Sequence, residues 1–81
     1  MQSSTEQSTA GQFRPIEVSI NGESRQVPPG QTIEQLLHWL NLNSERVAVE
    51  LNKQIVRKRS WAEAHVQDGA RIEIVEFVGG G

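Results

Sequence analysis

The chain ends in three consecutive glycines, Gly79, Gly80 and Gly81, directly after the residues Glu76-Phe77-Val78. A terminus without side chains is slender, and glycine permits close approach of the backbone to another molecule. Such a terminus can enter a narrow active site, where its free carboxylate can be activated. Terminal glycines also arise at frayed or engineered chain ends, so the rest of the sequence must decide between the two interpretations.

The remaining residues offer little to an enzyme. The chain has two histidines, His38 and His65, ten acidic residues and no cysteine. Without cysteine it has no thiol nucleophile, no thiolate metal site and no residue that could carry a persulfide. It also lacks the GxGxxG and phosphate-loop motifs, and no carboxylate stands near either histidine at the spacing of a metal site or a catalytic triad. We therefore expect no catalysis by its side chains, and no metal or cofactor bound to it.

The charge pattern restricts the possible partners. Eight basic and ten acidic residues give a net charge of −2, so the sequence predicts no nucleic-acid partner. The basic run at residues 57–59 is interpreted as a solvated turn, with a docking site for an acidic partner as the alternative. No segment resembles a membrane span or a signal peptide, which predicts a cytoplasmic protein without a membrane partner.

The first elements predicted are a disordered extension and a β-hairpin. Residues 1–15 are rich in Ser, Thr and Gln and contain a single bulky apolar side chain, too little to form a core. Alternating apolar and polar residues over 16–20 predict a strand with one buried face. The pair Asn21-Gly22 tolerates positive φ, which predicts a tight turn into a second strand ending at Val27.

A helix is predicted next. Thr32 and Gln35 have the spacing of a capping box, so the helix should begin near Ile33. Its apolar residues recur on one helical face: Ile33, Leu36, Leu37 and Leu40. We expect this stripe to pack on the sheet, with Trp39 beside it and half exposed.

The second half of the chain returns to strands. Alternation over residues 47–51 predicts a third strand, followed by a short return strand. Ser60 and Glu63 repeat the capping spacing, which predicts one helical turn that places Trp61 in the core. Residues 71–78 then read as the last strand. The order predicts an α+β fold, with one helix packed on one face of a mixed, mostly antiparallel sheet.

This organisation divides the chain into three parts. We expect a disordered extension over residues 1–15, a folded domain over 16–78 and a flexible glycine tail over 79–81.

The last strand suggests a docking surface. If Ile72 and Ile74 face the helix, Val75 and Phe77 fall on the opposite, open face of the sheet, just before the glycines. We interpret these two residues as a contact for a partner. The alternative is a β-bulge near Val75 that returns Phe77 to the core.

Three stretches carry a resemblance to a known family: PPGQTIEQLL, VAVELNKQIVRKRSWAE and DGARIEIVEFVGGG. Together with the order of elements and the terminal Gly-Gly, they resemble the ubiquitin-like β-grasp sulfur carriers, and among these the sulfur carriers of thiamine biosynthesis. The resemblance covers about residues 16–81. The small subunit of molybdopterin synthase is the nearest rival, but it commonly has two prolines before its final glycines, where this chain has Glu76-Phe77-Val78.

The resemblance implies a function without catalysis by this chain. In that family a partner, an E1-like adenylating enzyme, uses Mg-ATP to adenylate the terminal carboxylate, here that of Gly81. A sulfurtransferase supplies sulfur, the terminus becomes a thiocarboxylate, and thiazole synthase consumes that sulfur. Gly80 and Gly79 would thread the tail into the partner. A carrier for another sulfur pathway and a ubiquitin-like modifier of lysines remain as alternatives.

Overall fold

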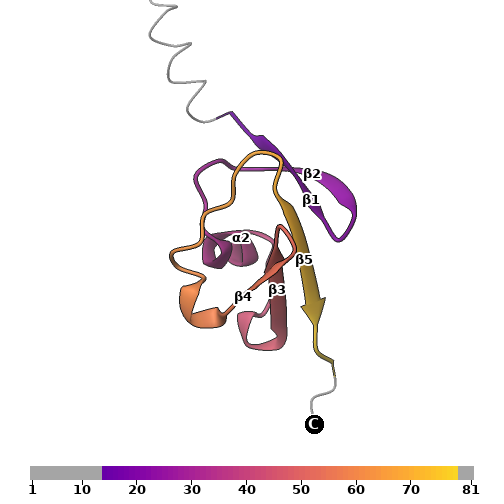
Figure 1. Ribbon diagram of the computed structural model, residues 1–81, viewed down its shortest axis with the longest axis vertical. Coiled ribbons are helices and arrows are strands. Elements are labelled where there is room, and N and C mark those ends of the chain that lie inside the picture. Colours follow the sequence, from indigo (N-terminus) through magenta and orange to yellow (C-terminus); the bar gives the residue numbers. More distant parts are fainter. Residues whose placement is uncertain (1–13, 79–81) are drawn as a thin grey trace, which may run out of the picture.

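The computed structural model describes residues 14–78, which form a five-stranded sheet and one α-helix (Figure 1). The strands are β1 (Ile16–Ile20), β2 (Glu23–Val27), β3 (Val47–Leu51), β4 (Gln54–Val56) and β5 (Arg71–Glu76), and the helix is α2 (Ile33–Trp39). Two 3-10 turns, η1 (Ser44–Arg46) and η2 (Lys58–Ser60), flank the pair β3 and β4. The predicted disorder of the extension concerns mainly residues 1–13, which lie outside the described residues, as do the glycines 79–81.

The strand that comes last in the chain lies in the middle of the sheet. The spatial order is β2-β1-β5-β3-β4, in which β5 pairs parallel with β1 and antiparallel with β3. The two outer pairs, β1 with β2 and β3 with β4, are antiparallel. The predicted mixed, mostly antiparallel sheet is therefore confirmed. Figure 1 shows β5 running past both neighbours toward the C-terminus.

Helix α2 forms at the predicted residues because both of its ends are capped. The Thr32 hydroxyl accepts the amide hydrogen of Gln35 at 3.2 Å, and the Gln35 side chain accepts that of Thr32 at 2.9 Å. At the other end Asn41 adopts a φ of 63°, a left-handed conformation that commonly terminates helices. The buried stripe of α2 packs against inward-facing residues of the sheet: Val18, Val27, Val49, Ile72 and Ile74.

The predicted turn around Trp61 is present. The carbonyl of Ser60 accepts the amide hydrogens of Glu63 and Ala64, both at 3.0 Å, so a backbone turn begins at Ser60. A further 3-10 turn that was not predicted, η2, lies directly before it over Lys58–Ser60, where the amides of Ser60 and Trp61 bond to the carbonyls of Arg57 and Lys58. The role predicted for Trp61 is confirmed: its ring is 4% exposed, and its indole N–H donates to the carbonyl of Val56 at 2.8 Å.

Replacing Trp61 should test how much its buried indole ring contributes to the stability of the domain. We expect Trp61→Phe to lower the free energy of unfolding by about 1–3 kcal/mol, because the carbonyl of Val56 loses its partner in a partly buried site. Trp39→Phe is the matched control, since Trp39 is 46% exposed, and it should change the value by less than about 0.5 kcal/mol. Urea-induced unfolding of both variants measures the difference, and equal losses would contradict the assignment.

Candidate functional site at the end of the central strand

The root of the C-terminal tail is anchored to the sheet as far as Phe77. The strand β5 ends at Glu76, two residues earlier than predicted, but the amide of Phe77 still donates to the carbonyl of Arg46 at 2.7 Å. The ladder ends there because Arg46 already belongs to the 3-10 turn before β3. Val78 is exposed, and the three predicted site residues, Gly79, Gly80 and Gly81, follow it outside the described residues.

The open face of the sheet exposes both residues predicted to form the contact. Val75 and Phe77 are each 56% exposed, whereas Ile74, in the same strand as Val75, faces the core. The pairing of β5 with β3 is regular, with Val75 opposite Ala48 and Ile74 opposite Val49, so β5 contains no bulge. The alternative that returned Phe77 to the core is therefore wrong. The docking role of the two residues remains a prediction.

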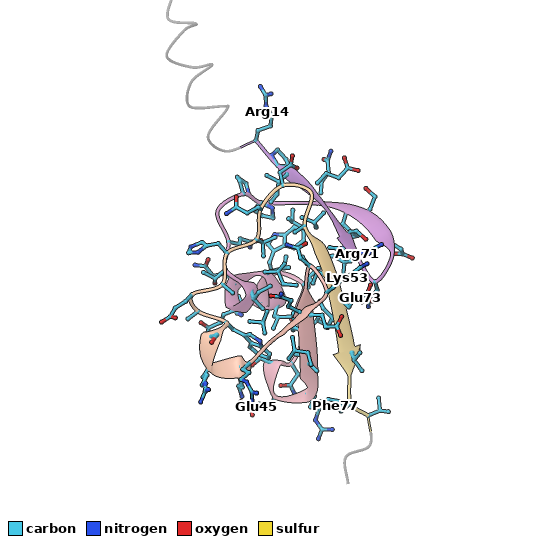
Figure 2. The ribbon with its side chains drawn as sticks, in the orientation of Figure 1. Arg14, Glu45, Lys53, Arg71, Glu73 and Phe77 are labelled. Atoms are coloured by element: carbon cyan, nitrogen blue, oxygen red, sulfur yellow. The ribbon has the colours of Figure 1, made fainter. Side chains whose placement is uncertain are left out.

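A shallow groove of about 460 Å³ lies on this open face. Its lining includes side chains from all three neighbouring strands and the β3–β4 turn: Ala48, Glu50, Lys53, Ile55, Arg71, Glu73 and Val75. The groove is apolar toward the tail, where Ala48 and Val75 face each other, and charged toward the start of β5. Figure 2 shows Arg71, Lys53 and Glu73 close together at that charged end, with Phe77 at the other end of the strand.

Of the residues that line this groove, the sequence predicted only Val75 for this surface; the apolar residues that it missed are Ala48 and Ile55. Ala48 alternates with the buried Val47 and Val49, so its outward direction could have been inferred. Ile55 is 75% exposed and lies opposite Glu50 on the outer strand β4. Its place next to the groove depends on the order of strands in the sheet, and this order cannot be inferred from the periodicity of the residues.

The charges outside the groove support the solvated-turn interpretation of residues 57–59. All three basic side chains are exposed. Lys58 forms the one ion pair found among the described residues, with a distance of 2.7 Å to the carboxylate of Glu45. The hydrogen bond and the charge of Lys58 lower the pKa of Glu45. Both partners are exposed, so this pair contributes little to stability.

The two histidines lie near opposite ends of helix α2. His38 is in the last turn of α2, whereas His65 bridges to Thr32 at the start of that helix. Within residues 14–78 no three His, Cys, Asp or Glu side chains gather as metal ligands. The single α-helix of this region is too short to cross a membrane.

A comparison with protein-family models finds the ThiS family over residues 18–81. The chain belongs to the ThiS family. A relative in Escherichia coli, the sulfur carrier protein ThiS, is 33% identical over 66 residues, which cover 82% of this chain and 100% of that protein. The resemblance inferred from the sequence motifs is therefore confirmed.

A solved structure and a further relative are also similar to this chain. The crystal structure of a thiamine biosynthesis protein (ThiS) from Geobacter metallireducens matches with a TM-score of 0.72 and 29% identity, over 82% of this chain and 100% of that one. This match confirms the predicted β-grasp fold of the ThiS family. A thiazole synthase from Paramagnetospirillum magneticum is 47% identical over 66 residues, 82% of this chain. That relative is much longer, and this chain spans 20% of its length.

The exposure of Phe77 predicts that it contributes little to stability. We expect Phe77→Ser to change the free energy of unfolding by less than about 0.5 kcal/mol, as for other surface positions. Ile74→Ser, on the buried face of the same strand, should cost about 3 kcal/mol or more, because it leaves a cavity and buries a hydroxyl. Chemical denaturation of both variants measures the contrast, and comparable losses would place Phe77 in the core.

Proposed function

We propose that this chain carries sulfur for the biosynthesis of thiamine on the carboxylate of Gly81. The observation that carries the proposal is the combination of a ThiS-family domain with a central strand whose last anchored residue, Phe77, directly precedes Val78 and three glycines. Four residues after Phe77 can span at most about 14 Å when extended. A partner that acts on Gly81 must therefore contact the domain close to the end of β5.

The chemistry proposed for the terminus needs no side chain of this protein. A free carboxylate is a poor acyl donor, so an adenylating enzyme joins its oxygen to the α-phosphate of Mg-ATP and releases pyrophosphate. The outer sulfur of a persulfide on the sulfurtransferase then attacks the carbonyl carbon, and AMP leaves as the C–S bond forms. A thiol reductant cleaves the S–S bond of this acyl disulfide, which releases the sulfurtransferase and leaves the sulfur on the carrier. The resulting thiocarboxylate is the sulfur nucleophile for the next enzyme. Since the chain has no cysteine, Gly81 is the position at which it can hold this sulfur.

Thiazole synthase is the proposed consumer of that sulfur. A relative named thiazole synthase contains a segment 47% identical to this chain, which supports a functional association of the carrier with that enzyme. The ThiS family membership of the chain points to the same pathway. The carrier is then a co-substrate of both partners, and Mg-ATP is bound by the activating partner.

The open face of the sheet is the proposed contact for the adenylating enzyme. Val75 and Phe77 are apolar, exposed and adjacent to the tail, so a partner that covers them is also within reach of Gly81. Aromatic side chains at the centre of an interface commonly supply a large part of the binding energy.

Changing the length of the terminus should abolish sulfur loading. We expect removal of Gly81, or addition of one residue after it, to prevent formation of a thiocarboxylate, because the carboxylate no longer meets the activating site. Intact-mass analysis of the chain after incubation with the adenylating enzyme, Mg-ATP and a sulfur donor measures the sulfur-for-oxygen mass difference. One residue added before Met1 is the matched control and should load normally. Normal loading of either C-terminal variant would exclude Gly81 as the carrier site.

Phe77→Ser should weaken the complex with the adenylating enzyme. The expected loss is about 1–3 kcal/mol of binding free energy, typical of an aromatic interface residue. Trp39→Ser is the control, because Trp39 is also an exposed aromatic residue but lies on α2, on the other side of the sheet. Titration calorimetry gives both affinities. The docking surface would be elsewhere if Phe77→Ser bound as tightly as the unmodified chain.

A further inference from the structure

The side chain of Asn21 forms two hydrogen bonds with the backbone of β5. Asn21 occupies the turn between β1 and β2 with a φ of 52°. Its Nδ2 donates to the carbonyl of Ile74 at 3.1 Å, and its Oδ1 accepts the amide hydrogen of Ile74 at 2.7 Å. The backbone amide of Asn21 also donates to the carbonyl of Ile72 at 2.9 Å. One turn residue therefore makes three hydrogen bonds to the central strand.

These bonds extend the pairing of β5 beyond the end of β1. The parallel register matches Ser19 with Arg71 and Ile20 with Ile72, and there β1 ends, while β5 continues to Glu76. A side-chain amide has the same donor and acceptor groups as a peptide bond. The amide of Asn21 thus takes the place of the next strand residue and satisfies both polar groups of Ile74.

Within residues 14–78, the second half of β5 has no other strand on that side. A hollow of about 250 Å³ lies there, and Asn21, Ile74 and Glu76 are among the residues that line it. On the opposite side β3 pairs with β5 through Val47 and Glu76. Without the amide of Asn21, the end of β5 would be held on one side only, by β3 and the bond from Phe77 to Arg46.

We propose that Asn21 is a positioning residue for the C-terminal tail. By holding β5 from the side of β1, its amide sets the direction in which the backbone leaves the sheet at Phe77 and Val78. The proposal rests on the proposed function, because direction matters only if a partner acts on the carboxylate of Gly81. A tail that leaves in the required direction enters the activating site in a larger fraction of complexes, which raises the turnover rate of the bound carrier.

The chain offers a closely matched control in Asn52. This residue also has a φ of 52° in a two-residue turn, between β3 and β4. Its Oδ1 accepts the amide hydrogen of Arg71 at 2.9 Å, and its own amide donates to the carbonyl of Arg71 at 2.7 Å. Asn52 therefore holds the same strand at the end remote from the tail. Glycine at either position keeps the positive φ and removes the side-chain bonds.

The experiment compares Asn21→Gly with Asn52→Gly in the full chain. Pyrophosphate exchange catalysed by the adenylating enzyme gives kcat and KM with the carrier as substrate. We expect Asn21→Gly to lower kcat about five- to tenfold, as for the loss of one or two hydrogen bonds, and to leave KM within about twofold because the open face is intact. Asn52→Gly should leave both constants within about twofold. Hydrogen exchange should show faster exchange of the Ile74 amide in Asn21→Gly alone.

The outcomes separate this proposal from the proposed function. No exchange with the unmodified chain would refute the proposed function and, with it, the role of Asn21. Activity of the unmodified chain together with an unchanged kcat for Asn21→Gly would refute the positioning role alone, as would an equal fall of kcat in Asn52→Gly. If Asn21→Gly is too unstable to assay, Asn21→Asp keeps the acceptor for the Ile74 amide but loses the donor. It should still lower kcat, and a normal kcat would overturn the proposal.

Discussion

The pairing of β5 between β1 and β3 is the constraint on which the rest of the molecule depends. Because β5 has a hydrogen-bonded neighbour on each side, the two hairpins of the chain become one sheet only through this strand. It also contributes Ile72 and Ile74 to the core that α2 covers. Because β5 is paired on both sides and precedes the glycines, the C-terminal tail begins at a strand that is held from two directions. The tail therefore starts from a fixed point, because only Val78 separates its glycines from Phe77, the last residue with a backbone hydrogen bond to the sheet.

The alternation of side chains along β5 gives this strand two functions at once. Its even-numbered isoleucines stabilise the domain, whereas Val75 and Phe77 remain exposed on the other face. A shift of one residue in register would exchange the two sets, burying Phe77 and exposing Ile74. The regular pairing with β3, from Val47 opposite Glu76 to Leu51 opposite Ile72, excludes that arrangement. Stability and the proposed docking surface thus depend on the same register.

Most elements could be predicted because their signals are local. The capping pair Thr32 and Gln35, the Asn21-Gly22 turn and the alternation over residues 16–20 each act within a few residues, and the structure contains all three. The central place of β5 is a long-range property that periodicity does not contain, and it was not predicted. The turn at Ser60 was predicted, but the 3-10 turn directly before it was not. That turn depends on backbone bonds to Arg57 and Lys58, for which the side chains give no signal.

The second role of Asn21 had no signal in the sequence, although its turn was predicted correctly. Aspartate or glycine would fit the same positive φ, and a turn prediction does not distinguish among them. What distinguishes asparagine is that its amide offers a donor and an acceptor together, and only the structure shows that Ile74 presents the complementary pair. This contact bears on the proposed reaction, for which no side chain of the chain is needed. If the reaction occurs on the backbone carboxylate of Gly81, the domain can influence it only by where it binds the partner and by how it directs the tail. The open face serves the first purpose, and the bonds that hold the end of β5 serve the second.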